Sequence, residues 1–165
     1  MALRSAKIAL VAALALYYTL VVFNNVTDYD SNFQFVRHVL MMDSTFPNNR
    51  GMWRALNPPA WHTLFYVGII LWEAVTAVLC WWGAARMMRA WRKEPDGFNR
   101  AKNVAVAGLA LAMLLWLGAF LIVGSEWFLM WQSKTWNGRE PAFHMFIVNG
   151  IVLLLVTQRD RDDGS

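Results

Sequence analysis

Cysteine and charged residues are both scarce in this sequence. The single cysteine, Cys80, cannot form an internal disulfide and lacks the paired spacing of a metal site, so we expect a plain packing residue. Charged residues make up 16% of the 165 residues, against about 25% in soluble domains. The shortage leaves four apolar runs long enough to cross a bilayer, which places the protein in the membrane class.

The motifs of soluble enzymes are also missing. The sequence contains no glycine-rich nucleotide loop, nucleophile elbow, zinc-protease histidine pair or cysteine pair. These absences favour a non-catalytic protein, and a membrane enzyme that uses Glu73 or Glu126 as acid or base is the catalytic alternative. The net charge of +4 does not predict a nucleic-acid partner, because the basic residues lie beside apolar runs, where they set membrane topology.

The apolar runs predict an all-α fold: a four-helix transmembrane bundle that forms one integral membrane domain over residues 1–165. The first run is longer than the core of a signal peptide and no good cleavage site follows it, so we expect an uncleaved helix. The last run is close to the lower length limit for a spanning helix. The expected spans cover about residues 7–26, 59–85, 103–130 and 142–157.

Basic residues gather at both termini and between the second and third spans. Because such residues are enriched on the cytoplasmic side of a membrane, they predict a multi-pass protein of the bacterial inner membrane with cytoplasmic N- and C-termini. The two tryptophan-bearing loops then face the periplasm. The basic residues at the termini and between the second and third spans are Arg4, Lys7, Arg86, Arg89, Arg92, Lys93, Arg100, Lys102, Arg159 and Arg161.

The first periplasmic loop is too long for a simple connection. Within it we expect a short amphipathic helix from Ser31 to Met42, capped by Asp30 or Ser31, with Phe33, Val36 and Leu40 on one face. Such a helix lies on the outer end of the bundle or at the lipid boundary.

Small residues four positions apart permit helices to approach closely within a bilayer. The two pairs are Ala9 with Ala13 and Gly108 with Ala112. They suit a compact bundle, and they equally suit a docking face for a partner protein.

Glu73 is the only charged residue deep inside an apolar run. A charge at membrane depth costs about 2.5–3.5 kcal/mol on insertion scales, which makes Glu73 a candidate functional residue. The alternative is structural: a protonated carboxyl that bonds to a neighbouring helix and fixes the bundle. The expected partners are Thr76, Tyr17, Tyr18 and Asn149.

The other unusual residues lie on the predicted periplasmic face. If the third helix continues through Gln132, Glu126 and Met130 lie one turn apart, as do Trp127 and Trp131. For Glu126 the structural expectation is an ion pair with Arg54 or Arg139. The candidate functional or ligand-contacting residues are Glu73, Glu126, His38, Asp43, Trp127, Trp131 and Trp136.

Three segments of the sequence carry long, specific patterns. They are Asn24-Asn25-x-Thr27-Asp28-Tyr29, Phe35-Val36-x-His38-Val39-Leu40-x-Met42-Asp43 and Glu126-Trp127-Phe128-x-Met130-Trp131-Gln132-Ser133-x-x-Trp136-Asn137-Gly138. Together they resemble a bacterial family of predicted small integral membrane proteins, catalogued as a domain of unknown function. The resemblance covers nearly the whole chain and implies a four-span inner-membrane protein, with no activity to carry over.

No cofactor is predicted, although three metal sites deserve comparison. His62 and His144 open two spans, but they are too shallow to bury a b-type haem. A zinc site would draw on His38, Asp43 and Glu126. Copper(I) prefers thioether and imidazole ligands, and the residues of that kind near the periplasmic face are His38, Met41, Met42, Met52, Met130 and Met145.

Because the distinctive residues gather on the periplasmic loops, the sequence favours a non-catalytic accessory or ligand-sensing subunit. It would act through its tryptophan-rich face on a membrane or periplasmic protein partner, or as a homo-oligomer, within the lipid bilayer. The alternative is a redox or proton-handling membrane protein with a haem, copper or quinone site. A small transporter would have only Glu73, Thr76 and Asn149 to line its path.

Overall fold

The computed structural model describes residues 1–160, and this part of the chain is helical without any strand. The α-helices are α1 (Ala2–Thr27), α2 (Tyr29–Met41), α3 (Pro59–Arg89), α4 (Pro95–Ala101), α5 (Asn103–Leu114) and α6 (Arg139–Thr157). The 3-10 helices are η1 (Met52–Arg54) and η3 (Met130–Gln132), and η2 (Leu115–Trp127) is a π-helix that continues α5. Arg161 and the end of the predicted domain lie outside the described residues.

Four helical segments within residues 1–160 are long and apolar enough to cross a membrane: Ala2–Thr27, Pro59–Arg89, Pro95–Trp127 and Arg139–Thr157. They confirm the predicted all-α, four-span architecture. The first span begins before its expected start and the second ends later, because the basic residues at those ends also form helical turns.

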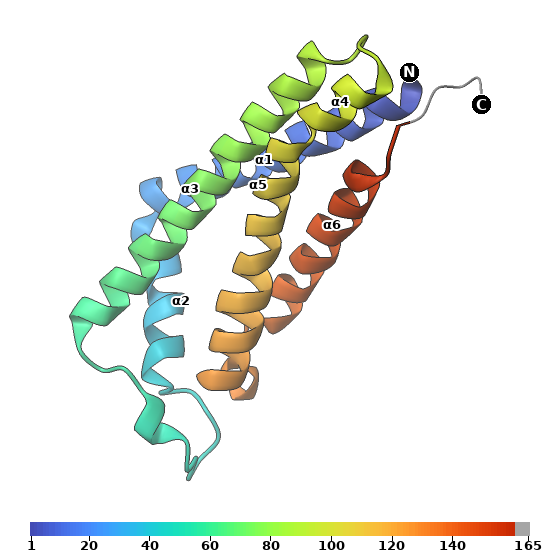
Figure 1. Ribbon diagram of the computed structural model, residues 1–165. Coiled ribbons are helices and arrows are strands. Elements are labelled where there is room, and N and C mark those ends of the chain that lie inside the picture. Colours follow the sequence, from blue (N-terminus) through green and yellow to red (C-terminus); the bar gives the residue numbers. More distant parts are fainter. Residues whose placement is uncertain (161–165) are drawn as a thin grey trace.

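The long helices α1, α3, α6 and the continuous α5–η2 run side by side (Figure 1). Both described ends of the chain and the connection from α3 to α4 lie at one end of the bundle, which we call the terminal end. Residues 42–58 lie at the opposite end, and hydrogen bonds join them to residues 129–136. We call this the loop end.

Helix α2 packs beside α3 in the half of the bundle nearer the loop end (Figure 1). Its buried residues are Val36, Val39 and Leu40. It begins earlier than expected, and the predicted cap is wrong: Asp28 holds the N-cap position without a side-chain bond, and Asp30 accepts a hydrogen bond from Gln34 instead. The position of α2 at the outer membrane boundary stays a prediction.

Small residues bring α3 and α5 into close contact. A Cβ atom built on Gly83 would lie 2.5 Å from the backbone nitrogen of Ala105, and one on Gly108 would lie 2.9 Å from the sulfur of Cys80. Gly108 therefore serves close helix approach, as its spacing indicates. Cys80 is fully buried in the core between these helices.

The outer surface of the bundle is rich in large apolar side chains. Exposed examples on three different helices are Leu16, Leu20, Leu64, Leu71, Val78, Ile151 and Leu154. A soluble monomer rarely exposes so much contiguous apolar surface. A hydrocarbon environment accounts for these side chains without any further partner.

The third span ends earlier than predicted. After Trp127 the chain leaves the helix, and Leu129 adopts a left-handed backbone conformation with φ of 56°. That conformation is strained for a bulky residue and redirects the chain. The helix therefore does not continue through Gln132, which is the condition under which Trp127 and Trp131 would lie one helical turn apart.

Candidate functional site

A groove opens between α2, α3 and η2 in the half of the bundle nearer the loop end. Its volume is about 730 Å³ and its lining is almost wholly apolar. A Cβ atom added to Gly68 or Gly118 would meet nothing within 4 Å, so both glycines widen the groove. Aromatic side chains supply much of the remaining wall: Phe35, Trp61, Phe65, Trp72, Phe120 and Phe128.

The wall formed by η2 has an uncommon geometry. A π-helix leaves wider turns than an α-helix, and it frequently occurs at functional sites. Trp72 on α3 donates a hydrogen bond of 3.0 Å to the carbonyl of Leu111, close to the point where α5 becomes η2. This bond fixes the distance between α3 and the start of the π-helix.

Phe35 connects the groove to the loop end. Its ring stacks on that of Phe120 in the groove wall with centroids 6.4 Å apart, and it meets Trp136 edge-on at 6.5 Å. Trp136 in turn stacks on His38, with ring centroids 4.6 Å apart and planes within 7°. The Nδ1 atom of His38 lies 2.6 Å from Oδ2 of Asp43. Phe35, Trp136, His38 and Asp43 thus form a continuous series of contacts from the groove to the loop end.

Gly138 makes room for Phe35. A Cβ atom at this position would lie 2.7 Å from Cζ of Phe35. The Asn137-Gly138 pair reads in sequence as a turn signal, and the close approach of the aromatic ring is an additional reason for glycine.

Hydrogen bonds join the two connections at the loop end. Oε1 of Gln132 accepts hydrogen bonds of 3.1 Å from the backbone of Phe46 and 3.4 Å from Nδ2 of Asn49. The hydroxyl of Ser44 donates to that of Ser133 at 2.8 Å. These contacts hold residues 42–51 against residues 129–136, so the loop end behaves as one surface.

Arg54 lies at this surface, close to Trp53 and Trp127. Its guanidinium carbon is 5.5 Å and 5.4 Å from their ring centroids, and it donates a hydrogen bond of 3.0 Å to the carbonyl of Trp127. Glu126 contributes only its backbone carbonyl, 3.4 Å from Arg54. The predicted ion pair is therefore wrong, since Glu126 forms no ion pair within residues 1–160; Glu126 and Arg139 instead line a second cavity of about 490 Å³.

Glu73 is buried, with 2% of its surface exposed. Its Oε2 accepts a hydrogen bond of 2.7 Å from Asn25 on α1. Asn25 is itself held by Nδ2 of Asn32, which donates to its Oδ1 at 2.8 Å, and by the hydroxyl of Tyr66, which donates to its carbonyl at 3.2 Å. The carboxyl group of Glu73 therefore joins α3 to α1.

The partners expected for Glu73 are wrong. Thr76 donates its hydroxyl hydrogen to the carbonyl of Trp72 on its own helix. The hydroxyl of Tyr18 accepts hydrogen bonds from Asn149 at 3.0 Å and Trp116 at 2.8 Å, which makes a separate buried cluster across α1, α6 and η2. No hydrogen bond joins Tyr17 to Glu73. Asn25 was missed, although it belongs to the first of the three patterns, because the sequence does not show which face of α1 meets α3.

The histidine and carboxylate residues considered for haem or zinc do not form one group in the described part of the chain. Within residues 1–160, no group of three or more His, Cys, Asp or Glu side chains is placed to hold a metal ion. His38 and Asp43 are paired without Glu126. Nε2 of His62 lies 2.7 Å from the carbonyl of Leu56, and His144 is exposed.

Four membrane-length helices within residues 1–160 and an outer surface rich in large apolar side chains define a small multi-span integral membrane protein. The chain belongs to the family described as "Predicted small integral membrane protein (DUF2165)", which it matches over residues 3–159. This confirms the resemblance carried by the three patterned segments. No curated protein and no solved structure matches the chain.

Proposed function

We propose that the protein is a non-catalytic subunit of the bacterial inner membrane that senses a lipid-type ligand. The hydrocarbon chain of the ligand lies in the groove between α2, α3 and η2, and the loop end meets a protein partner on the periplasmic side. Both termini lie in the cytoplasm.

The groove carries this proposal. Its volume of about 730 Å³ is within the range of about 300–1,000 Å³ that is typical of small-molecule sites. Its nearly apolar lining offers no set of polar groups for a hydrophilic substrate, whereas it suits a hydrocarbon chain. Helix α2 supplies one wall, so the ligand contacts an element that lies outside the four spans.

The shared position of Phe35 supports a sensing role. A ligand that binds one arrangement of Phe35 more tightly than another shifts the population of that arrangement. Trp136 and His38 follow Phe35 through direct ring contacts. Occupancy of the groove thereby changes the surface offered to a partner.

The orientation rests on the charge pattern. Arg4, Lys7 and Lys102 lie at the terminal end, whose basic residues favour the cytoplasmic side. The loop end with its tryptophans then faces the periplasm.

The orientation is tested by cysteine labelling. Cys80 is replaced by Ala, and a cysteine is introduced at exposed Asn48. A membrane-impermeant thiol reagent should label this cysteine in intact spheroplasts. If the cysteine is labelled only after lysis, the orientation is contradicted.

Ligand binding is tested by filling the groove. Gly68→Leu and Gly118→Leu place side chains into open space within it, and Val78→Leu is the matched control on an exposed site of α3 outside the groove. Each protein is purified in mild detergent, and bound lipid-type molecules are extracted and quantified by mass spectrometry. We expect the two glycine variants to lose the bound molecule and the control to keep it; equal retention in all three contradicts the proposal.

The partner is tested separately by cross-linking in native membranes. A photo-reactive residue at position 131 of the loop end should capture a specific protein, whereas one at exposed position 154 in α6 should capture lipid. Identical adducts from both positions contradict an interface at the loop end.

A further inference from the structure

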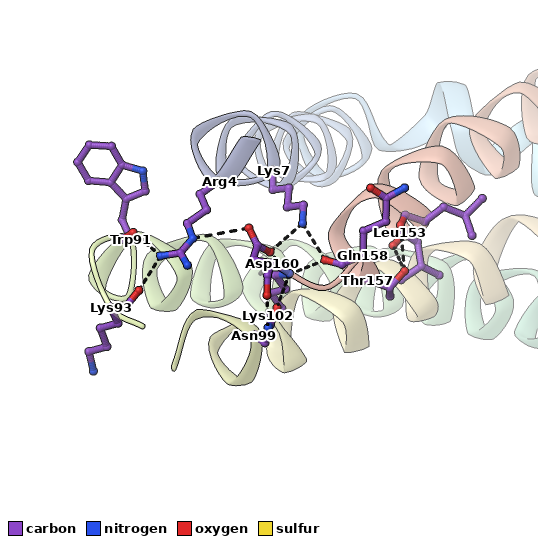
Figure 2. A network of polar contacts seen from close by, with 11 residues as sticks. Arg4, Lys7, Trp91, Lys93, Asn99, Lys102, Leu153, Thr157, Gln158 and Asp160 are labelled. Carbon is purple, nitrogen blue, oxygen red and sulfur yellow. Dashed lines mark hydrogen bonds and ion pairs between the residues drawn. The ribbon is translucent and has the colours of Figure 1, made fainter. Parts of the chain in front are cut away.

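At the terminal end, three cationic side chains converge on one carboxylate (Figure 2). Asp160 follows α6, and its Oδ2 accepts hydrogen bonds from the ammonium groups of Lys7, at 2.8 Å, and Lys102. The Nε of Arg4 lies 3.6 Å from the other oxygen, Oδ1. The four side chains come from α1, from the junction of α4 with α5, and from the segment after α6.

The segment containing Asp160 is docked by its backbone as well. Asn99 accepts a hydrogen bond from the amide of Asp160 and donates one to its carbonyl, both at 3.1 Å. The ammonium groups of Lys7 and Lys102 also donate to the carbonyl of Gln158, at 2.8 Å and 2.7 Å. Residues 158–160 therefore occupy the space between the cations without forming helix.

The cluster has more positive than negative charge. Lys7 is 1%, Lys102 is 3% and Arg4 is 9% exposed, and Asp160 is the one carboxylate paired with them among the described residues. The Nη1 atom of Arg4 donates hydrogen bonds to the carbonyls of Trp91 and Lys93, which follow the end of α3. These backbone carbonyls thus satisfy part of the hydrogen bonding of Arg4. Within residues 1–160, however, the three buried cations face a single full negative charge, and buried charges are stable only when paired.

We propose that Asp160 occupies an anion-binding site whose external ligand is a phosphate group, held by Arg4, Lys7 and Lys102 once residues 158–160 move away. Inorganic phosphate offers an oxygen to each cation and more negative charge than the carboxylate that it replaces, and a phosphodiester headgroup offers two unesterified oxygens with a charge equal to that of the carboxylate. The segment after α6 then acts as an internal competitor for the site.

The location of the cluster fits a phosphate at the membrane surface. It lies where α1 begins and α6 ends, at the end of the bundle that carries the basic residues. Basic pockets between transmembrane helices on the cytoplasmic side bind anionic lipid headgroups. Inorganic phosphate presents the same kind of anionic oxygen and is the other source of the ligand.

The binding experiment uses the full-length protein in phosphatidylcholine nanodiscs. In one arm phosphatidylglycerol is added to the nanodiscs. In the other arm inorganic phosphate is added to the buffer, and chloride at equal ionic strength is the control. Asp160→Asn removes the competing charge and keeps the side-chain shape. Asp96→Asn is the control, because Asp96 is exposed on α4 and forms no ion pair or side-chain hydrogen bond among the described residues. We expect Asp160→Asn to bind the anion about tenfold more tightly, as one charge-assisted bond implies, and Asp96→Asn to match the native protein.

Removal of a cation completes the design. Adding Lys102→Gln to Asp160→Asn should abolish the gain, whereas adding Arg100→Gln, at an exposed neighbouring position, should keep it. Hydrogen exchange of residues 158–160 in the native protein is an independent measurement, and it should accelerate when the anion is added. A response to phosphatidylglycerol alone identifies a lipid headgroup, and a response to both identifies any phosphate. No gain in Asp160→Asn over Asp96→Asn, with unchanged exchange, overturns the site.

Discussion

The side-chain amide of Asn25 on α1 donates a hydrogen bond of 2.7 Å to the buried carboxyl group of Glu73 on α3. The carboxyl group thereby gains a partner from another helix at a depth where water is scarce. This contact gives Glu73 a structural task, since α1 and α3 are neighbours along much of their length. Substitutions of Glu73 that keep or remove this hydrogen bond separate a structural role from proton transfer.

Replacement of Glu73 by Gln should leave the protein folded and functional if the residue is structural, because the Gln carbonyl still accepts from Asn25. Glu73→Leu removes the acceptor and leaves the Asn25 amide unsatisfied, which should cost about 1–3 kcal/mol. Unfolding in detergent measures both variants. Thr76→Val is the control, since Thr76 bonds only to its own helix. A folded Gln variant that fails in ligand retention or partner capture would instead indicate proton handling.

Two glycines on α3 should respond in opposite ways to the same substitution. Gly83→Ala places a methyl group 2.5 Å from the backbone of Ala105, which cannot move as a side chain can, so α3 and α5 must separate. We expect a loss of about 1–3 kcal/mol in unfolding free energy. Gly68→Ala meets open space and should be neutral, or gain up to about 1 kcal/mol from helix propensity. Equal thermal stability of the two variants would show that the α3–α5 contact is not close-packed.

The number and type of the spans were predictable, because an apolar run of membrane length must satisfy its backbone internally as a helix. The ends of the spans were less predictable. The helical turns carrying Arg4 and Arg89 continue beyond the apolar cores, and the left-handed turn at Leu129 ends the third span within a run of apolar residues.

The groove and the cluster at Asp160 were not predictable, because each depends on which helix faces meet. Phe35 and Phe120 are far apart in the sequence, and only the packing of α2 against η2 brings them together. Arg4, Lys7 and Lys102 each read as topology signals, and nothing in their spacing indicates that they share a carboxylate. The Asn25–Glu73 bond was missed for the same reason.

The ion cluster at the terminal end makes stability dependent on acid pH. Burial alone raises the pKa of the Asp160 carboxyl, but hydrogen bonds from Lys102 and Lys7 outweigh it and hold this pKa below its ordinary value of 3.8. Stability from a lowered pKa is complete above the unfolded-state value and is lost as the pH falls through the folded-state value. In phosphatidylcholine, the native protein should therefore melt above Asp160→Asn by a constant margin at neutral pH, and the margin should close below 3.8. The difference in melting temperature between the native protein and Asp96→Asn should not change in this way. If the difference between the native protein and Asp160→Asn persists in acid, it comes from side-chain shape and not from charge.

The substitution Gly138→Ala tests the connection between the loop end and the groove without altering a residue that lines the groove. The new methyl group would lie 2.7 Å from Cζ of Phe35, and the ring can turn away only by changing its packing against Phe120 and Trp136. We expect retention of the bound lipid-type molecule to fall several-fold, since its binding depends on the position of Phe35, while the helix content stays unchanged. Gly150→Ala on α6 is the matched control, because its methyl group makes only ordinary contact with Met113 at 3.4 Å. If Gly138→Ala retains as much ligand as Gly150→Ala, Phe35 does not couple the groove to the loop end.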